Sequence, residues 1–210
     1  MARPRSNISE RIREAASERF LAEGVDGASL RAIAADAKTN IGMIYYYYPT
    51  KEDLFQAVVE DVYSKLVVDL VAALTPDGSV EQRLQRLFER LGALGEDELR
   101  VLRLVVCESL RSMERFERFA QRFQAGHIAL IAQLVQEAFG AGTFAAGRHP
   151  LVAMVSVVAL AGFAQVAARF AGPRLPFANP PSGPALSRDL VQVLLHGLAA
   201  SPTSRPPHGT

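Results

Sequence analysis

Apolar residues recur at spacings of three and four along most of this 210-residue chain. Near the N-terminus Ile8, Ile12, Ala16 and Phe20 keep this spacing, which places them along one face of an amphipathic helix. The sequence contains no convincing run of alternating apolar and polar residues, the pattern of a half-buried strand. It therefore predicts an all-α fold.

Turn-forming and capping residues divide the chain into segments of helix length. Gly24 ends the first helix, Ser29 caps the second, and residues 38–40 connect it to the third. Thr50 and Ser79 each stand three residues before a side chain that completes a capping box. We expect the first two helices over about residues 7–23 and 30–37, a third that ends at residue 48, a fourth that reaches residue 74 and a fifth that begins at residue 79. Further helices are expected over about residues 97–112, 114–139, 148–171 and 185–199.

The composition is that of an ordinary soluble globular protein, with 49% hydrophobic and 21% charged residues. One cysteine, Cys107, excludes an internal disulfide and a cysteine-based zinc site, and it suits a reducing cytoplasm. The N-terminus lacks the apolar segment of a secretory signal, so we expect a cytoplasmic protein. The four histidines lack metal-ligand spacing and no glycine-rich phosphate loop occurs, so we expect no catalytic residue, metal or cofactor.

The first three predicted helices have the pattern of a helix-turn-helix unit. Two short helices joined by a few residues rest on an amphipathic first helix, and the last of them must protrude to enter a DNA major groove. Ile33, Ala34, Ile44 and Tyr48 are assigned to the core of this unit. The net charge is only +1, so a DNA-binding surface must be local.

Residues 29–54 resemble the DNA-reading segment of the tetracycline-repressor-like (TetR) family. The resemblance covers about residues 6–66. It rests on a long first helix that ends in Phe20 and Gly24, on Ile33-Ala34, Gly42, Ile44-Tyr45 and Tyr47-Tyr48, and on Lys51 before Leu54. Lys38 stands where the family commonly has glycine, and Tyr48 where it has phenylalanine. A positive φ at Lys38 would cost roughly 1 kcal/mol relative to glycine.

The resemblance implies a DNA-binding domain over residues 6–66, with its helix-turn-helix motif at about 29–48. A helical effector-binding and dimerisation domain would span residues 67–200, and residues 201–210 would form a disordered tail. The implied protein is a ligand-responsive repressor that binds a palindromic operator as a homodimer; an activator of the same family is the alternative. By position, the DNA-contacting residues would be Ser29, Arg31, Lys38, Thr39, Asn40, Met43, Tyr45, Tyr46, Tyr47 and Lys51.

The segment 114–139 carries three phenylalanines and His127 on one apolar stripe. In the resembled family this region lines a cavity for a small, largely apolar effector, whereas periodicity alone fits an ordinary core equally well. Cys107 also fits buried packing, His127 also fits a hydrogen bond inside the core, and Gln165 needs a partner from a ligand or a second chain. The candidate effector-pocket residues are Phe88, Leu91, Cys107, Phe116, Phe119, Phe123, His127 and Gln165.

The segments 148–171 and 185–199 are more apolar than one small body requires. Two such helices from each of two chains would bury one another in a four-helix bundle. The candidate dimer-interface residues are Met154, Val158, Gly162, Leu190 and Leu194. Two other interpretations remain: a membrane span over residues 151–168, and an enzyme that uses Cys107 or a histidine.

Overall fold

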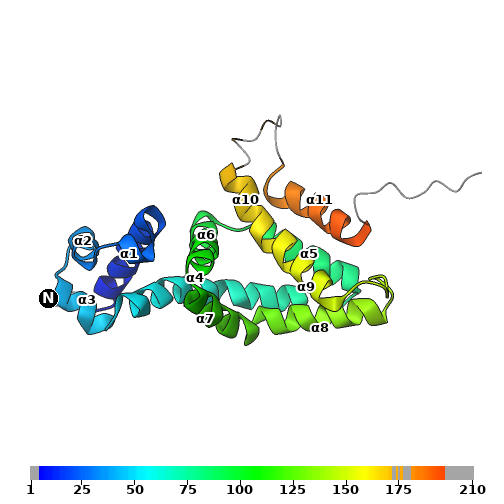
Figure 1. Ribbon diagram of the computed structural model, residues 1–210, viewed down its shortest axis with the longest axis horizontal. Helices are drawn as coiled ribbons and strands as arrows, with labels where there is room; N and C mark the ends of the chain where they lie inside the picture. Colours follow the sequence, from blue (N-terminus) through cyan, green and yellow to red (C-terminus); the bar gives the residue numbers. More distant parts are fainter. Residues whose placement is uncertain (1–4, 172–173, 175, 177–180, 197–210) are drawn as a thin grey trace, which may run out of the picture. The chain divides into compact units, whose positions relative to one another are not determined.

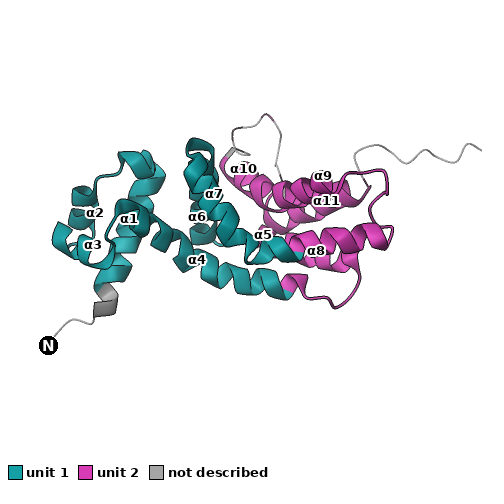
Figure 2. Ribbon diagram, turned by 60° about the horizontal axis from the view of Figure 1, so that its bottom comes forward, with its two compact units in different colours: residues 1–72, 94–130 teal, residues 73–93, 131–210 magenta. Residues whose placement is uncertain are grey.

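The computed structural model describes residues 5–171, 174, 176 and 181–196 (Figure 1). Within these ranges every regular element is a helix and no strand is present, which confirms the all-α prediction. The predicted tail at residues 201–210 lies outside the described residues. The chain divides into two compact units: unit 1 contains residues 1–72 and 94–130, and unit 2 contains residues 73–93 and 131–210 (Figure 2).

Unit 1 begins with the three-helix motif α1 (Arg5–Gly27), α2 (Leu30–Asp36) and α3 (Ile41–Tyr47). The predicted apolar stripe of α1 forms its core, where Ile12, Ala16 and Phe20 are buried with Ile33 and Ile44. Gly24 breaks α1 as expected, because its φ of 75° lies in the left-handed region that favours glycine. A further helical turn then ends at Gly27.

The remainder of unit 1 consists of α4 (Lys51–Leu74, in this unit up to Ala72), α6 (Glu96–Arg111) and α7 (Met113–Gln124). Helix α6 packs against both α1 and α7. Phe55 of α4 makes edge-to-face contacts with Phe20 and Phe119, at centroid distances of 5.7 Å and 5.6 Å. Helix α7 therefore shares a core with the N-terminal motif, and the compact units do not coincide with the predicted domains.

The single helix predicted over residues 114–139 is wrong. Helix α7 ends at Gln124, and α8 (His127–Gly140) begins three residues later. At Gly126 an added Cβ would lie 2.5 Å from the Tyr63 hydroxyl, so a side chain here would have to displace the end of Tyr63. The apolar spacing continues across the break through Phe123 and His127, which is why periodicity does not reveal it.

Unit 2 contains α5 (Val80–Gly92), α8 from Ile131, α9 (Pro150–Val158), the π-helical segment η1 (Ala159–Phe163), α10 (Ala164–Ala171) and α11 (Gly183–His196). Helix α11 packs against α5 and η1. Ser79 and Gln82 form the predicted capping box at the start of α5.

The buried side chain of Gln165 donates to the Ser187 hydroxyl at 3.0 Å, across the contact between α10 and α11. The expectation that a ligand or a second chain satisfies Gln165 is therefore wrong, because its partner belongs to the same chain. At Gly92 an added Cβ would lie 2.1 Å from the Ser187 hydroxyl oxygen, so a glycine allows α5 and α11 to approach.

Candidate nucleic-acid interface

The turn between α2 and α3 is built by local backbone geometry. Lys38 has a φ of 50°, the positive value that the sequence raised as a possibility. The backbone N–H groups of Lys38 and Thr39 donate to the carbonyls of Ala35 and Ala34, at 3.0 Å and 2.9 Å. Asn40 then caps α3, because its side-chain oxygen accepts the Met43 N–H at 3.0 Å. Its amide oxygen is thus engaged in the cap.

Lys38 offers a test of this geometry. We expect Lys38→Gly to raise the free energy of unfolding by up to about 1 kcal/mol, because glycine adopts a positive φ without steric cost. Lys38→Ala is the control, since it removes the same charge and keeps the strained backbone. Urea unfolding of the two variants provides the comparison, and a glycine variant no more stable than the alanine variant would contradict the interpretation.

Helix α3 has one buried face and one exposed face. Ile44 is fully buried, whereas Tyr45 and Tyr46 are 51% and 68% exposed. Met43 and Tyr47 are half-buried. A helix anchored on one side with aromatic side chains projecting from the other is suited to enter a groove.

Tyr48 fixes the end of α3 to α1. Its ring is buried, its hydroxyl lies 2.8 Å from the Ser9 hydroxyl, and it accepts a hydrogen bond from Arg13 at 3.3 Å. Ser9 and Arg13 therefore satisfy the hydrogen bonds of the Tyr48 hydroxyl. The phenylalanine that the resembled family has at this position would carry no such group. The assignment of Tyr48 to the core agrees with this burial.

Lys51 carries a role that the sequence did not reveal. Its ammonium group donates to the backbone carbonyls of Asp26 and Ala28, at 2.8 Å and 3.2 Å, and so joins the start of α4 to the end of α1. An ammonium group has three N–H donors, so one remains for a phosphate. The capping box of Thr50 and Asp53 is present, with both reciprocal backbone bonds at 3.0 Å.

The other predicted contact residues lie around α2 and the turn. Ser29 and Arg31 are exposed, and Thr39 is half-buried. Ser29 occupies the N-cap position of α2, but its side chain makes no capping bond, so that part of the prediction is wrong. The hydroxyl is not engaged at the helix end.

An apolar cavity of about 220 Å³ lies along α7 in unit 1, and we call it the α7 cavity. It is lined by Phe116, Phe119 and Phe123, together with Ser109, Ala120, Gln124 and Ile128. The predicted pocket residues Phe88, Leu91 and Gln165 belong to unit 2 instead. Phe88 is fully buried there. Cys107 is exposed, so its assignment to buried packing is wrong; the buried face of α6 is formed by Leu104, Val105 and Glu108.

His127 is held inside unit 1 by Tyr63, whose hydroxyl lies 3.0 Å from its Nδ1 atom. Burial lowers the pKa of His127 from 6.5 to about 4. Two neighbours of this pair carry no negative charge: the Phe123 ring contacts the imidazole, and the Arg122 guanidinium lies over the Tyr63 ring. This environment supports the interpretation of His127 as a hydrogen-bonded core residue.

The depressed pKa of His127 predicts a specific loss of stability in acid. Between pH 6.5 and about pH 4 the unfolded chain binds a proton at His127 that the folded chain excludes, so stability falls as the pH falls. The full effect is roughly 3 kcal/mol. Urea unfolding across this range is expected to show a steeper loss for the wild type than for His127→Gln. Equal slopes would contradict a buried neutral histidine.

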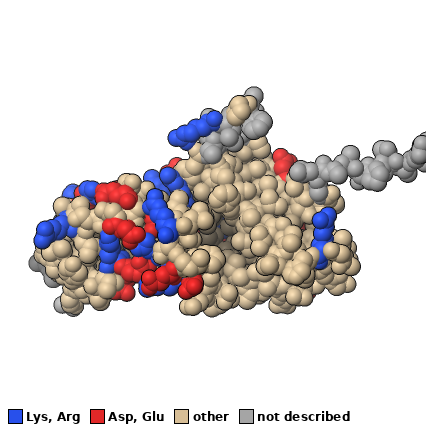
Figure 3. All heavy atoms as spheres, viewed as in Figure 1, with Lys and Arg blue, Asp and Glu red and all other residues tan. Residues whose placement is uncertain are grey.

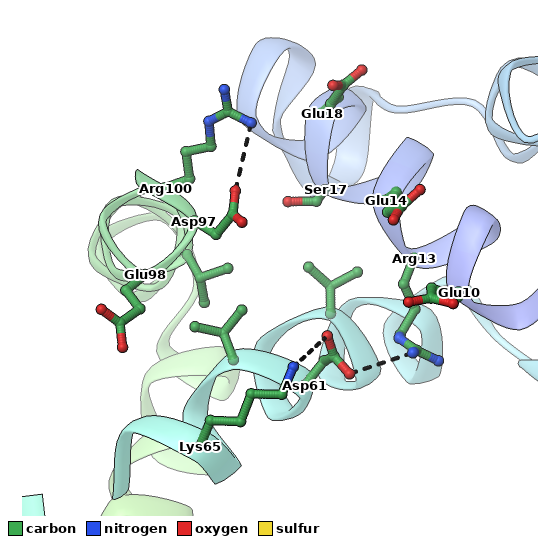
Figure 4. A pocket seen from close by; sticks show the side chains of 13 residues that line it. Glu10, Arg13, Glu14, Ser17, Glu18, Asp61, Lys65, Asp97, Glu98 and Arg100 are labelled. Atoms are coloured by element: carbon green, nitrogen blue, oxygen red, sulfur yellow. Dashed lines mark hydrogen bonds and ion pairs between the residues drawn. The ribbon is translucent and has the colours of Figure 1, made fainter. Parts of the chain in front are cut away.

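A cavity of about 560 Å³ in unit 1 has a lining rich in charged side chains (Figure 4). It lies between α1, α4 and α6, and several of its lining side chains are paired with one another. Asp61 bonds Arg13 at 3.3 Å and Lys65 at 3.8 Å, while Arg100 lies 3.9 Å from Asp97. Such a lining does not suit the apolar effector that the sequence predicts. The sequence did not indicate this cavity, because its lining residues come from three separate helices.

Unit 2 presents an apolar surface along α9 and η1, which we call the α9 face. Leu151, Val152, Val155, Val158 and Phe163 are between 39% and 64% exposed on it. Among the predicted interface residues, Val158 lies on this face, and Met154, Leu190 and Leu194 are half-buried. A Cβ added at Gly162 would meet no atom within 4 Å, so this position is open. In the view of Figure 3, charged side chains crowd over unit 1 and are sparse on unit 2.

The α9 face is part of the one helical stretch, among the described residues, that is long and apolar enough to cross a membrane. This stretch, Pro150–Phe170, has a mean hydropathy of 2.2, and 28% of its most apolar window is buried. An interface helix in a soluble protein meets the same criteria of length and composition.

Two short helices on a longer first helix, with the last one exposing its aromatic face, define the helix-turn-helix class of DNA-binding proteins. The family model described as "Bacterial regulatory proteins, tetR family" matches residues 12–58. This segment of the chain, which holds the helix-turn-helix motif, is therefore similar to the tetR family.

Curated relatives match part of the chain. An HTH-type transcriptional repressor of Streptomyces coelicolor is 32% identical over 133 residues, which are 59% of this chain and 65% of that protein. The HTH-type transcriptional repressor NicS of Pseudomonas putida is 42% identical over 55 residues, 26% of each chain. The chain thus spans less than two thirds of the length of these relatives.

Solved structures share the fold over nearly the whole chain. A putative fatty acid metabolism regulator of Clostridium perfringens has a TM-score of 0.75 at 17% identity, covering 91% of this chain and all (100%) of that one. The regulator FadR of Bacillus subtilis, solved in complex with stearoyl-CoA, has a TM-score of 0.71 at 16% identity, covering 90% and 99%. At these identities the likeness establishes the fold alone.

Proposed function

We propose that this protein is a ligand-responsive transcriptional repressor that binds a palindromic operator as a homodimer. The observation that carries the proposal is the exposed face of α3, where Tyr45 and Tyr46 project from a helix whose opposite face is buried. The family and the relatives named as repressors support the same function.

In this proposal α3 enters the major groove, with Met43 and Tyr46 at the base edges. Tyr45, Tyr47 and Lys51 contact phosphates or support that contact. The other contacts to the DNA backbone come from α2 and from the turn before α3, namely from Ser29, Arg31, Lys38, Thr39 and Asn40. Phosphate contacts fix the position of the protein on the duplex, and base contacts select its sequence.

The homodimer would form through the α9 face and the neighbouring part of α11. The exposed valines and Phe163 on this face supply apolar area of the kind that obligate dimers bury. Two-fold symmetry then pairs the two α3 helices with half-sites spaced by about one turn of DNA, roughly 34–36 Å.

The effector would be a small, largely apolar molecule, and the α7 cavity is its proposed site in unit 1. Phe116, Phe119 and Phe123 offer it an aromatic lining. The stearoyl-CoA bound by FadR of Bacillus subtilis is an apolar chain with a polar head, which agrees in character with this lining. An effector acts by binding unequally to the DNA-competent and DNA-incompetent states of the protein. We also propose that the protein is cytoplasmic, because its operator lies in that compartment.

Selection from random duplex DNA at one fixed salt concentration tests the proposal. We expect a palindrome to be enriched, Tyr46→Ala to change the selected sequence, and Tyr47→Ala and Lys51→Ala to weaken binding to all sequences. The lysine variant also loses its bonds to α1, so its unfolding curve serves as the control. The proposal fails if no sequence is enriched. In a separate test, recovery of the protein only in detergent would favour a membrane-associated function for Pro150–Phe170.

A further inference from the structure

Arg115, at the start of α7, is the centre of an ion cluster in unit 1. Its guanidinium bonds both carboxylate oxygens of Asp26 at 2.7 Å and 3.1 Å, Glu108 at 2.7 Å and Glu52 at 3.2 Å. We call these four residues the Arg115 cluster. The Arg115 side chain is 10% exposed and that of Glu108 is 1% exposed, so these two are largely shielded from solvent, whereas Asp26 lies at the exposed edge of the cluster.

The cluster joins four helices at the base of the helix-turn-helix motif. Asp26 lies in the last turn of α1, Glu52 in the first turn of α4, and Glu108 in α6. The second oxygen of Glu108 accepts the backbone N–H of Val25 at 3.4 Å, which ties α6 to the same end of α1. Removing the Arg115 guanidinium would break its bonds to Asp26, Glu52 and Glu108 together.

The same end of α1 holds Lys51. The backbone carbonyls that receive the Lys51 ammonium belong to Asp26 and Ala28, and Lys51 directly precedes Glu52. The position of Lys51 relative to α3 therefore depends on how α1 and α4 are fixed. A planar guanidinium can hold several carboxylates in fixed directions, which the single-point charge of a lysine cannot.

Electrostatics within the cluster agree with this geometry. The hydrogen bonds that Arg115 donates to Asp26 lower the pKa of Asp26 and raise the pKa of Arg115. The guanidinium also lies 5.7 Å from the centroid of the Phe55 ring, which packs against Phe20 of α1. Charge pairing and ring packing thus act on the same junction.

We propose that Arg115 is a positioning residue for operator binding. It acts through Asp26 and Glu52, which hold the end of α1 and the start of α4 in the arrangement that presents Lys51 and α3 to DNA. The inference rests on the proposed function. It also adds a route for regulation, because Phe116 and Phe119 on the same helix line the α7 cavity, and a ligand that shifts this turn of α7 moves Arg115.

Asp26→Asn is the principal test. The Asp26 side chain is 79% exposed, so the variant removes the bidentate bond without leaving a buried charge unpaired. Glu60→Gln is the matched control, since Glu60 also forms a bidentate pair between α4 and α7, with Arg122, at 2.6 Å and 2.9 Å. Asp26→Glu retains the carboxylate and is the rescue variant.

Binding of the selected palindrome and of unrelated duplex DNA is measured by fluorescence anisotropy for all three variants. We expect Asp26→Asn to lower the ratio of specific to non-specific affinity by about tenfold. Glu60→Gln and Asp26→Glu should retain the wild-type ratio, and unfolding in urea should be alike for Asp26→Asn and Glu60→Gln. An unchanged ratio for Asp26→Asn, or an equal fall for Glu60→Gln, overturns the positioning role.

Hydrogen exchange without DNA separates this inference from the proposed function. We expect amides of α3 and of the first turn of α4 to exchange faster in Asp26→Asn than in Glu60→Gln. If wild-type protein selects no DNA but this difference is present, the proposed function fails, while the Arg115 cluster still fixes the end of α1 and the start of α4. If wild-type protein selects a palindrome and exchange is equal in the two variants, the positioning role fails alone.

Discussion

Replacing Phe55 by alanine is expected to lower the free energy of unfolding by about 3 to 5 kcal/mol. Phe55 is fully buried and contacts Phe20 of α1 on one side and Phe119 of α7 on the other. Its removal leaves a cavity where three helices meet, and the Arg115 guanidinium loses the ring beside it. Urea unfolding followed by far-ultraviolet circular dichroism measures the change.

Phe116→Ala is the matched control for that variant, because the Phe116 side chain is 50% exposed on the neighbouring helix α7. We expect its cost to be well below that of Phe55→Ala, since less apolar surface leaves water there. A loss under about 1 kcal/mol for Phe55→Ala would mean that α4 and α7 do not share a core.

Val155→Glu is expected to disrupt the proposed homodimer. Val155 is 56% exposed in the centre of the α9 face, where a partner chain would bury it. A carboxylate buried there without a partner costs about 2 to 5 kcal/mol, which raises the dimer dissociation constant at least about 30-fold. Sedimentation velocity measures the association, and binding to DNA with one or two half-sites measures its effect on operator recognition.

Val68→Glu provides the comparison for Val155→Glu, because Val68 is 65% exposed but lies on α4 in unit 1. It should remain dimeric and bind the two-half-site operator as the wild type does. If Val155→Glu also remains a dimer of wild-type affinity, the proposed interface is wrong. Binding of a single half-site should be similar in all three proteins.

The sequence predicted the helices and the N-terminal motif well, because these depend on local rules. The apolar stripe of α1, the capping box at Ser79 and the break at Gly24 each follow from spacing or from one residue type. The positive φ at Lys38 followed from comparing this turn with the resembled family. In each case the determining contacts lie within a few residues along the chain.

Features that depend on tertiary partners were not visible in the sequence. The close approach of Tyr63 to the break before His127 comes from far away in the sequence, and Gln165 is satisfied by Ser187. Lys51 was assigned to DNA without its bonds to α1. Cys107 resembles a core residue by its apolar neighbours, yet the helix turns it outward.

The Arg115 cluster was missed for the same reason. Its members are charged residues, which usually face solvent, on four different helices, and nothing in their spacing links them. Only the packing of α6 and α7 against the end of α1 brings the charges together and buries Glu108. A burial pattern of this kind cannot be recovered from periodicity, which treats charged positions as solvent-facing.

The division of the chain into compact units has a consequence for protein engineering. A hybrid regulator that joined residues 1–66 of this chain to the body of a relative would cut through a shared core and leave Phe55 without Phe119, and Asp26 without Arg115. A graft that also carries residues 94–130 keeps these pairs intact. Transplanting the DNA specificity of this protein therefore requires two stretches of its sequence.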